Sequence, residues 1–168
     1  MQLTKDINLL TEKEFLSIFG SIFEKSQWIA ENVFKLKPFS SPNDLKDKMI
    51  NIFNNSSYEK IIEIFKFHPK LAIEKKLSLF SSKEQKNAKL NICTEQELAE
   101  FRNLNENYEK KFGFPFIISV KGKNKSDILK NFRIRIKNNI NEEFEEAKSQ
   151  VVNIASFRLD EILDEKFF

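Results

Sequence analysis

Three side chains in this sequence have types and positions suited to chemistry: His68, Glu84 and Arg158. His68 is the single histidine of the chain; it follows an apolar-periodic run at 58–67, and Pro69 restricts its backbone. Because an imidazole titrates near neutral pH, a histidine held at a helix end is a candidate proton donor. The structural alternative is a histidine that caps the helix or packs partly buried.

Glu84 closes the sequence Ser81-Ser82-Lys83-Glu84, which has the spacing of a capping box. In such a box the serine hydroxyl and the carboxylate each accept a hydrogen bond from a backbone N–H group. A helix N-terminus also attracts anions and polar ligands, and Gln85 adds an amide that both donates and accepts. Two interpretations of Glu84 therefore stay open: a helix cap, or a polar group in a ligand site.

Arg158 lies within an apolar stripe of the last predicted helix, together with Val151, Ile154, Ala155 and Ile162. A guanidinium on a core-facing stripe is destabilising unless it is paired. It must therefore extend to solvent, meet an internal carboxylate, or face a cavity that receives an anion, for which its planar fork suits a carboxylate.

The elements that position these residues are predicted to be helices. Apolar residues at helical spacing follow helix-start signals at Thr11, Ser41-Pro42, Ser56, Ser81, Thr94, Ser126 or Asp127, and Asn141. Gly113 is placed to end a long helix, and a short apolar extended run follows it. We predict a single all-α domain over 1–168, with seven or eight helices and one extended segment near 114–120.

Composition excludes several classes of protein. One Cys and one His exclude a disulfide framework, a zinc finger and a metal site with several histidines, so no metal is expected. The net charge of +3, with Glu interspersed among Lys, gives no reason to expect a nucleic-acid partner. No apolar run is long enough for a membrane span and no secretory signal is visible, so a cytoplasmic protein is expected. The runs at 121–125 and 142–146 are interpreted as solvated faces.

Taken in order, several segments resemble the 2-oxo-4-hydroxy-4-carboxy-5-ureidoimidazoline (OHCU) decarboxylase family. They are Trp28-Ile-Ala with Lys37-Pro38-Phe39, His68-Pro69-Lys70-Leu71-Ala72, Ser81-Ser-Lys-Glu84-Gln85 with Ala88 and Leu90, Asn105 and Asn107-Tyr108, Lys111-Phe-Gly-Phe-Pro-Phe-Ile117, and Arg158-Leu159. The chain departs from the family pattern at Lys70, where Asp is usual, and at Ile73 and Lys89, where Gly is usual. These departures flank the expected site and remove no expected catalytic side chain.

The resemblance implies a cofactor-free carboxy-lyase of urate degradation that forms (S)-allantoin and acts as a homodimer. It implies that His68 donates the proton and that Glu84 binds the substrate hydroxyl or orients the imidazole. Arg158 would orient a carboxylate or ring carbonyl. The remaining lining would come from Pro69, Ser81, Ser82, Lys83, Gln85 and the backbone of Phe116, Ile117, Ile118, Ser119 and Val120, whose polar groups are expected to be available to a flat heterocycle. The alternative is a non-enzymatic helical interaction module that retains the fold.

Overall fold

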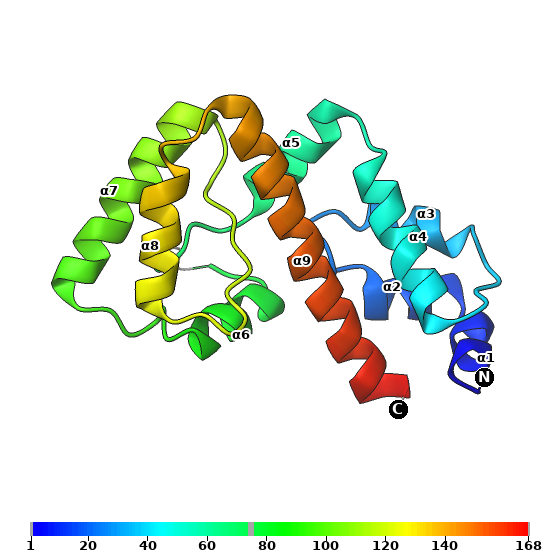
Figure 1. The fold of residues 1–168 in the computed structure, drawn as a ribbon. Coiled ribbons are helices and arrows are strands. Elements are labelled where there is room, and N and C mark those ends of the chain that lie inside the picture. Colours follow the sequence, from blue (N-terminus) through cyan, green and yellow to red (C-terminus); the bar gives the residue numbers. More distant parts are fainter. Residues whose placement is uncertain (1, 74–75, 168) are drawn as a thin grey trace. The chain divides into compact units, whose positions relative to one another are not determined.

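The computed structural model describes residues 2–73 and 76–167, and within them it contains nine helices and no strand. The helices are α1 (Gln2–Leu9), α2 (Glu12–Phe19), α3 (Trp28–Phe34), α4 (Pro42–Asn54), α5 (Tyr58–Phe67), α6 (Leu79–Asn87), α7 (Glu95–Phe112), α8 (Lys125–Arg135) and α9 (Ile140–Phe167) (Figure 1). The all-α prediction is confirmed. None of the helices in this described part is both long and apolar enough to cross a bilayer.

The helix beyond the predicted seven or eight is α1, which lacks a recognisable start signal. Tertiary contacts hold it. Ile7 is fully buried. The Asn8 side chain donates to the Phe39 carbonyl oxygen at 2.9 Å and accepts from the Phe39 N–H at 2.8 Å. A short helix whose stability comes from such contacts has no signature in a local sequence window.

The chain divides into two compact units. The first comprises the described residues of 1–64 and 152–168. In it α3 packs against α2 and α4. Its core is rich in phenylalanine: the Phe15 ring lies 4.7 Å from that of Phe19, and Phe23 lies 5.2 Å from Phe53. Aromatic bulk supplies this unit with its apolar interior.

The second unit comprises the described residues of 65–151. In it α7 and α8 lie side by side (Figure 1). The fully buried Tyr108 of α7 is surrounded by phenylalanine rings, and Phe116 stacks on Phe132 of α8 with centroids 3.9 Å apart. This aromatic cluster joins the two helices to the segment that follows α7.

Helix starts follow the predicted capping chemistry at some places and shift at others. Thr11 and Thr94 form capping boxes as predicted, Ser41 caps α4, and Gly113 ends α7 in the left-handed conformation with φ of 78°. The other predicted starts are wrong by one to three residues. The observed caps are Ser57 instead of the predicted Ser56, Ser78 instead of Ser81, Asn124 instead of Ser126 or Asp127, and Asn139 instead of Asn141. In each case a nearby Ser or Asn of equal capping strength wins, which a local pattern does not distinguish.

Candidate active site

His68 lies directly after α5, as predicted. The helix ends at Phe67, and the His68 N–H donates to the Phe65 carbonyl oxygen at 3.1 Å. His68 is only 8% exposed, and Pro69 beside it is half-buried. The imidazole is therefore held close to a helix terminus and largely shielded from solvent.

The segment after His68 is tied to two helices through a single peptide group. Asn105 of α7 donates from Nδ2 to the Leu71 carbonyl oxygen at 3.2 Å. The N–H of the same peptide group, on Ala72, donates to Oε1 of Gln85 on α6 at 3.1 Å. Ala72 has φ of 66°, a left-handed conformation that costs a residue with a β-carbon about 1–2 kcal/mol. These two amides thus hold a strained turn four residues beyond His68.

The start of α6 differs from the prediction in a way that matters for Glu84. The helix begins at Leu79, and Ser78 accepts from the Ser81 N–H at 3.2 Å. Ser81 is therefore the third residue of the helix and Glu84 the sixth, so Glu84 is not the closing carboxylate of a capping box. The interpretation of Glu84 as a helix cap is wrong.

Within α6 the predicted lining residues differ in burial. Ser81 and Gln85, four residues apart on one helix face, are buried, and Glu84 is half-buried. Ser82 and Lys83 are exposed. Gln85 contacts the segment that carries His68, through the Ala72 N–H.

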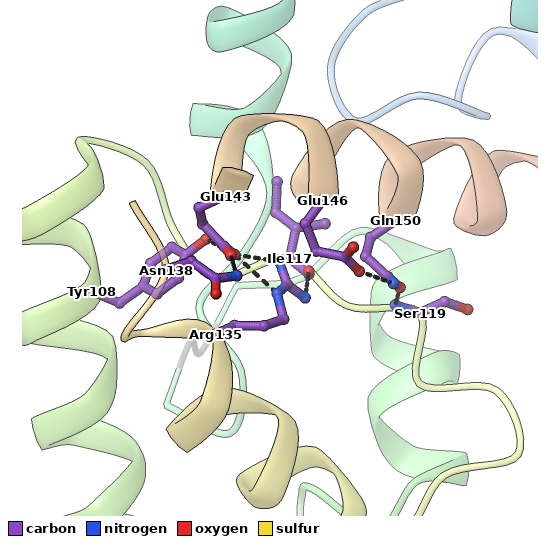
Figure 2. A network of polar contacts seen from close by, with 8 residues as sticks. All are labelled: Tyr108, Ile117, Ser119, Arg135, Asn138, Glu143, Glu146 and Gln150. Carbon is purple, nitrogen blue, oxygen red and sulfur yellow. Dashed lines mark hydrogen bonds and ion pairs between the residues drawn. The ribbon is translucent and has the colours of Figure 1, made fainter. Parts of the chain in front are cut away.

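The segment 114–120 is buried along its whole length and contains no helix or strand. Arg135 of α8 donates to the Ile117 carbonyl oxygen at 2.7 Å, and the Ser119 N–H donates to Gln150 of α9 at 2.9 Å (Figure 2). The Ser119 carbonyl oxygen accepts from Lys123 at 2.9 Å, and that of Val120 from the Lys123 N–H at 3.0 Å. The expectation that the backbone polar groups of this segment lie open is therefore wrong for these four.

A buried polar network anchors this segment. Glu143 is fully buried and accepts from Tyr108 Oη, from Arg135 Nε at 2.9 Å and Nη2 at 2.6 Å, and from Asn138 at 3.0 Å (Figure 2). Burial raises the pKa of the Tyr108 phenol far above its usual range, and the hydrogen bond to Glu143 adds to the rise. The interpretation of 142–146 as a solvated face is wrong for Glu143, because a guanidinium, a phenol and an amide compensate its burial.

Arg158 pairs with an internal carboxylate. Its Nη2 lies 2.9 Å from Glu24 Oε1 and its Nη1 donates to the Ile22 carbonyl oxygen at 3.0 Å. Arg158 is 2% exposed and Glu24 is 4% exposed. All three residues belong to the first unit, whereas His68 and Glu84 belong to the second. The ion pair is one of the alternatives that the sequence left open for Arg158.

Four residues that hold segments of the candidate site have no role predicted from the sequence: Asn105, Arg135, Glu143 and Gln150. Asn105 was visible only as one of the matching segments of the resemblance. The sequence pattern does not single out the other three, since a buried Glu and an exposed Glu look alike in a charge run.

Lys70, where the chain departs from the family pattern, forms an ion pair with Glu109 of α7 at 2.6 Å, and both side chains are partly exposed.

A family model described as OHCU decarboxylase matches residues 8–160. The chain is 42% identical over 161 residues to the uric acid degradation bifunctional protein PucL of Bacillus subtilis, a match that covers 96% of this chain and 33% of that protein. It is 33% identical over 157 residues to the 2-oxo-4-hydroxy-4-carboxy-5-ureidoimidazoline decarboxylase of Haloferax volcanii, covering 94% of each protein.

The fold is also similar to a solved structure. The crystal structure of (S)-allantoin synthase matches with a TM-score of 0.77 and 29% identity, over 95% of this chain and 53% of that chain. The chain spans about a third of the length of the two Bacillus relatives that it matches, at 33% of each.

Proposed function

Because this chain belongs to the OHCU decarboxylase family, we propose that it is a carboxy-lyase that converts 2-oxo-4-hydroxy-4-carboxy-5-ureidoimidazoline to (S)-allantoin in urate degradation. The observation that carries the proposal is the family match over residues 8–160, which includes His68, Glu84, Gln85 and Arg158. The buried His68 and the braced turn after it agree with a site for acid–base chemistry.

The chemistry of this substrate needs an acid and a means of orientation. The carbon that carries the carboxylate and a hydroxyl adjoins a C=N bond. When the bond to the carboxylate breaks, CO₂ leaves, the electron pair of that bond forms a C=C bond, and the C=N electron pair moves onto the nitrogen, giving an enol-like intermediate. One proton must then reach the ureido-bearing carbon from one face, while the hydroxyl becomes a carbonyl and its proton neutralises the nitrogen. The electron sink lies within the substrate, so the proposal includes no cofactor and no metal.

We assign the proton donation to His68. An imidazole can donate and accept a proton near neutral pH, which suits it to general acid catalysis. Its position between a helix end and Pro69 limits its conformations, which suits delivery to one face of a planar intermediate. Glu84 would accept a hydrogen bond from the substrate hydroxyl or orient the imidazole. The observation that Ser78 caps α6, so that Glu84 is not part of a capping box, supports this role.

The proposed binding residues are Pro69, Ser81, Ser82, Lys83, Gln85 and the backbone of 116–120, with Arg158 orienting a carboxylate or ring carbonyl. Gln85 has the strongest support, since it already contacts the His68 segment. A guanidinium carries five N–H donors, so the contacts of Arg158 with Glu24 and Ile22 do not by themselves exclude a substrate contact. We also propose a homodimer of single-domain chains, as the resemblance implies, and a cytoplasmic location.

The test measures optically active product. Urate is supplied together with uricase and the hydrolase that precedes this step, and circular dichroism follows the formation of dextrorotatory allantoin. We expect the full chain to accelerate the signal over spontaneous decay. We expect His68→Ala to lose about 100-fold or more of that acceleration, since general acid catalysis contributes a factor of about 10²–10⁴.

The matched control is Lys66→Ala, an exposed position two residues earlier in the last turn of α5. It should retain the wild-type rate, because it changes the same helix end without touching the proposed acid. A wild-type chain that gives no acceleration would remove the assignment and favour the interaction module. A His68→Ala variant as fast as wild type would remove only the role of His68.

A further inference from the structure

The Leu71–Ala72 peptide group is held from both sides by side-chain amides. Asn105 donates to its carbonyl oxygen at 3.2 Å, and its N–H donates to Gln85 at 3.1 Å. Asn105 is 2% exposed and Gln85 is 6% exposed, so water does not compete for these bonds. A second bond, from Asn105 Nδ2 to the Phe101 carbonyl oxygen at 2.8 Å, fixes the Asn105 amide on α7.

The held turn is one that the chain would not adopt by itself. Ala72 has φ of 66°, and a backbone in this region persists where its surroundings determine it. Pro69 stiffens the other end of the same turn. The two restraints enclose a stretch of only three residues, 69–71, so a displacement of the clamped peptide is transmitted to His68.

Gln85 and Asn105 together form a clamp on this peptide group, and the clamp is not optimised for stability. Gln85 binds the peptide through Oε1 and Asn105 through Nδ2. The other polar atoms of the two amides, Gln85 Nε2 and Asn105 Oδ1, are buried with no hydrogen-bond partner among the residues that the structure describes. Leaving a buried donor and a buried acceptor unpaired is unfavourable, and a clamp with a purely structural role would avoid it. Such an unfavourable arrangement is characteristic of a functional site, where another requirement outweighs stability.

We propose that Asn105 is a positioning residue for the decarboxylation: by clamping the Leu71–Ala72 peptide together with Gln85, it fixes the turn that aims the His68 imidazole. The inference rests on the proposed function for its catalytic consequence. Asn105 acts through the peptide and needs no contact with substrate. Its loss misdirects the imidazole, so it lowers kcat more than it raises KM.

His68 is the single histidine of the chain, and this gives a readout that does not depend on activity. A carbon-edited NMR spectrum of the full chain contains one imidazole Cε1–H signal, which needs no assignment. We expect Asn105→Ala to shift or broaden this signal at fixed pH. Asn105→Ser is the second variant: its hydroxyl still reaches the Phe101 carbonyl within the helix but is too short for Leu71, so it removes the clamp with less risk to folding.

The matched control is Thr94→Ala, which removes the N-cap of the same helix α7 at a position remote from Asn105. This variant lowers stability without touching the clamp, so its histidine signal and kcat should equal those of wild type. For the Asn105 variants we expect kcat to fall about 10- to 100-fold with a smaller change in KM, which is the loss typical of a small misplacement.

Three outcomes overturn the inference: a folded Asn105→Ser variant whose histidine signal is unchanged, one whose kcat stays within threefold of wild type, or a Thr94→Ala variant with an equal loss of kcat. If the wild-type chain shows no decarboxylase activity but the histidine signal moves in the Asn105 variants, the proposed function fails and the positioning of His68 stands.

Discussion

At the scale of single residues, burial decides what a titratable group does. Tyr108 is fully buried among aromatic rings and donates to the carboxylate of Glu143, so ionising it would place a second negative charge beside the first. The folded protein therefore keeps the phenol protonated, with its pKa raised chiefly by burial.

This predicts how stability depends on pH. The unfolded chain releases the Tyr108 proton near pH 10, about the unperturbed value, whereas the folded chain retains it. The unfolded state then binds fewer protons, so the stabilisation is complete below pH 10 and is lost as pH rises through and above it. The measurement is tyrosinate absorbance in a Tyr58→Phe variant, where Tyr108 is the one tyrosine left of two.

We expect no tyrosinate absorbance at pH 10–11 while circular dichroism shows a folded chain, and its full appearance on unfolding. Tyr58 is 56% exposed, so its replacement should not disturb the core. Half-maximal tyrosinate absorbance near pH 10 in the folded variant would contradict the prediction.

At the scale of elements, the end of α6 places a residue other than glycine in a left-handed conformation. Past the end of α6 the Leu90 N–H donates to the Gln85 carbonyl oxygen at 2.8 Å, and the Lys89 N–H donates to that of Lys86 at 2.9 Å. This is the Schellman arrangement, which requires a left-handed residue after the helix cap. Lys89 takes that place with φ of 59°.

Lys89→Gly should therefore stabilise the protein. Glycine removes a left-handed strain of about 1–2 kcal/mol. It also loses more conformational entropy on folding than lysine does, at a cost of about 0.5–1 kcal/mol, so the expected net gain in stability is about 0.5–1 kcal/mol. Lys89→Ala is the control: it removes the same exposed side chain but keeps the β-carbon and the strain. Urea unfolding measures both, and equal midpoints for the two variants would count against the argument.

At the scale of the whole molecule, each of the two units is held together internally by contacts between segments that are distant in sequence. In the first unit Arg158 joins the C-terminal helix to Glu24, 134 residues away in sequence. In the second unit, Asn105 joins α7 to Leu71, 34 residues away. Both contacts are buried, so each partner depends on the other for compensation.

Removing Arg158 alone should be strongly destabilising. In Arg158→Met the Glu24 carboxylate stays buried without its guanidinium, a change that costs about 3–5 kcal/mol. The double variant Arg158→Met with Glu24→Gln should recover part of this loss, because no buried charge is then left uncompensated.

The control is Lys46→Met in α4, which removes the more exposed ion pair with Asp160 of α9 and should cost about 0–1 kcal/mol. Thermal unfolding of the full chain measures all three variants. A double variant as unstable as Arg158→Met would show that the charge of Glu24 is not the cause.

By itself the sequence determined the helical class, the helix end at His68 and the family resemblance. It could do so because apolar periodicity, capping residues and proline restriction act within a few neighbours along the chain. Only the tertiary structure decided which of several nearby capping residues is used, that Glu143 is buried while its neighbours are not, that Arg158 meets Glu24, and that Asn105 and Gln85 hold one peptide. These outcomes depend on which distant side chains meet in a water-free interior, where an unpaired polar group is costly, and no local window contains that information.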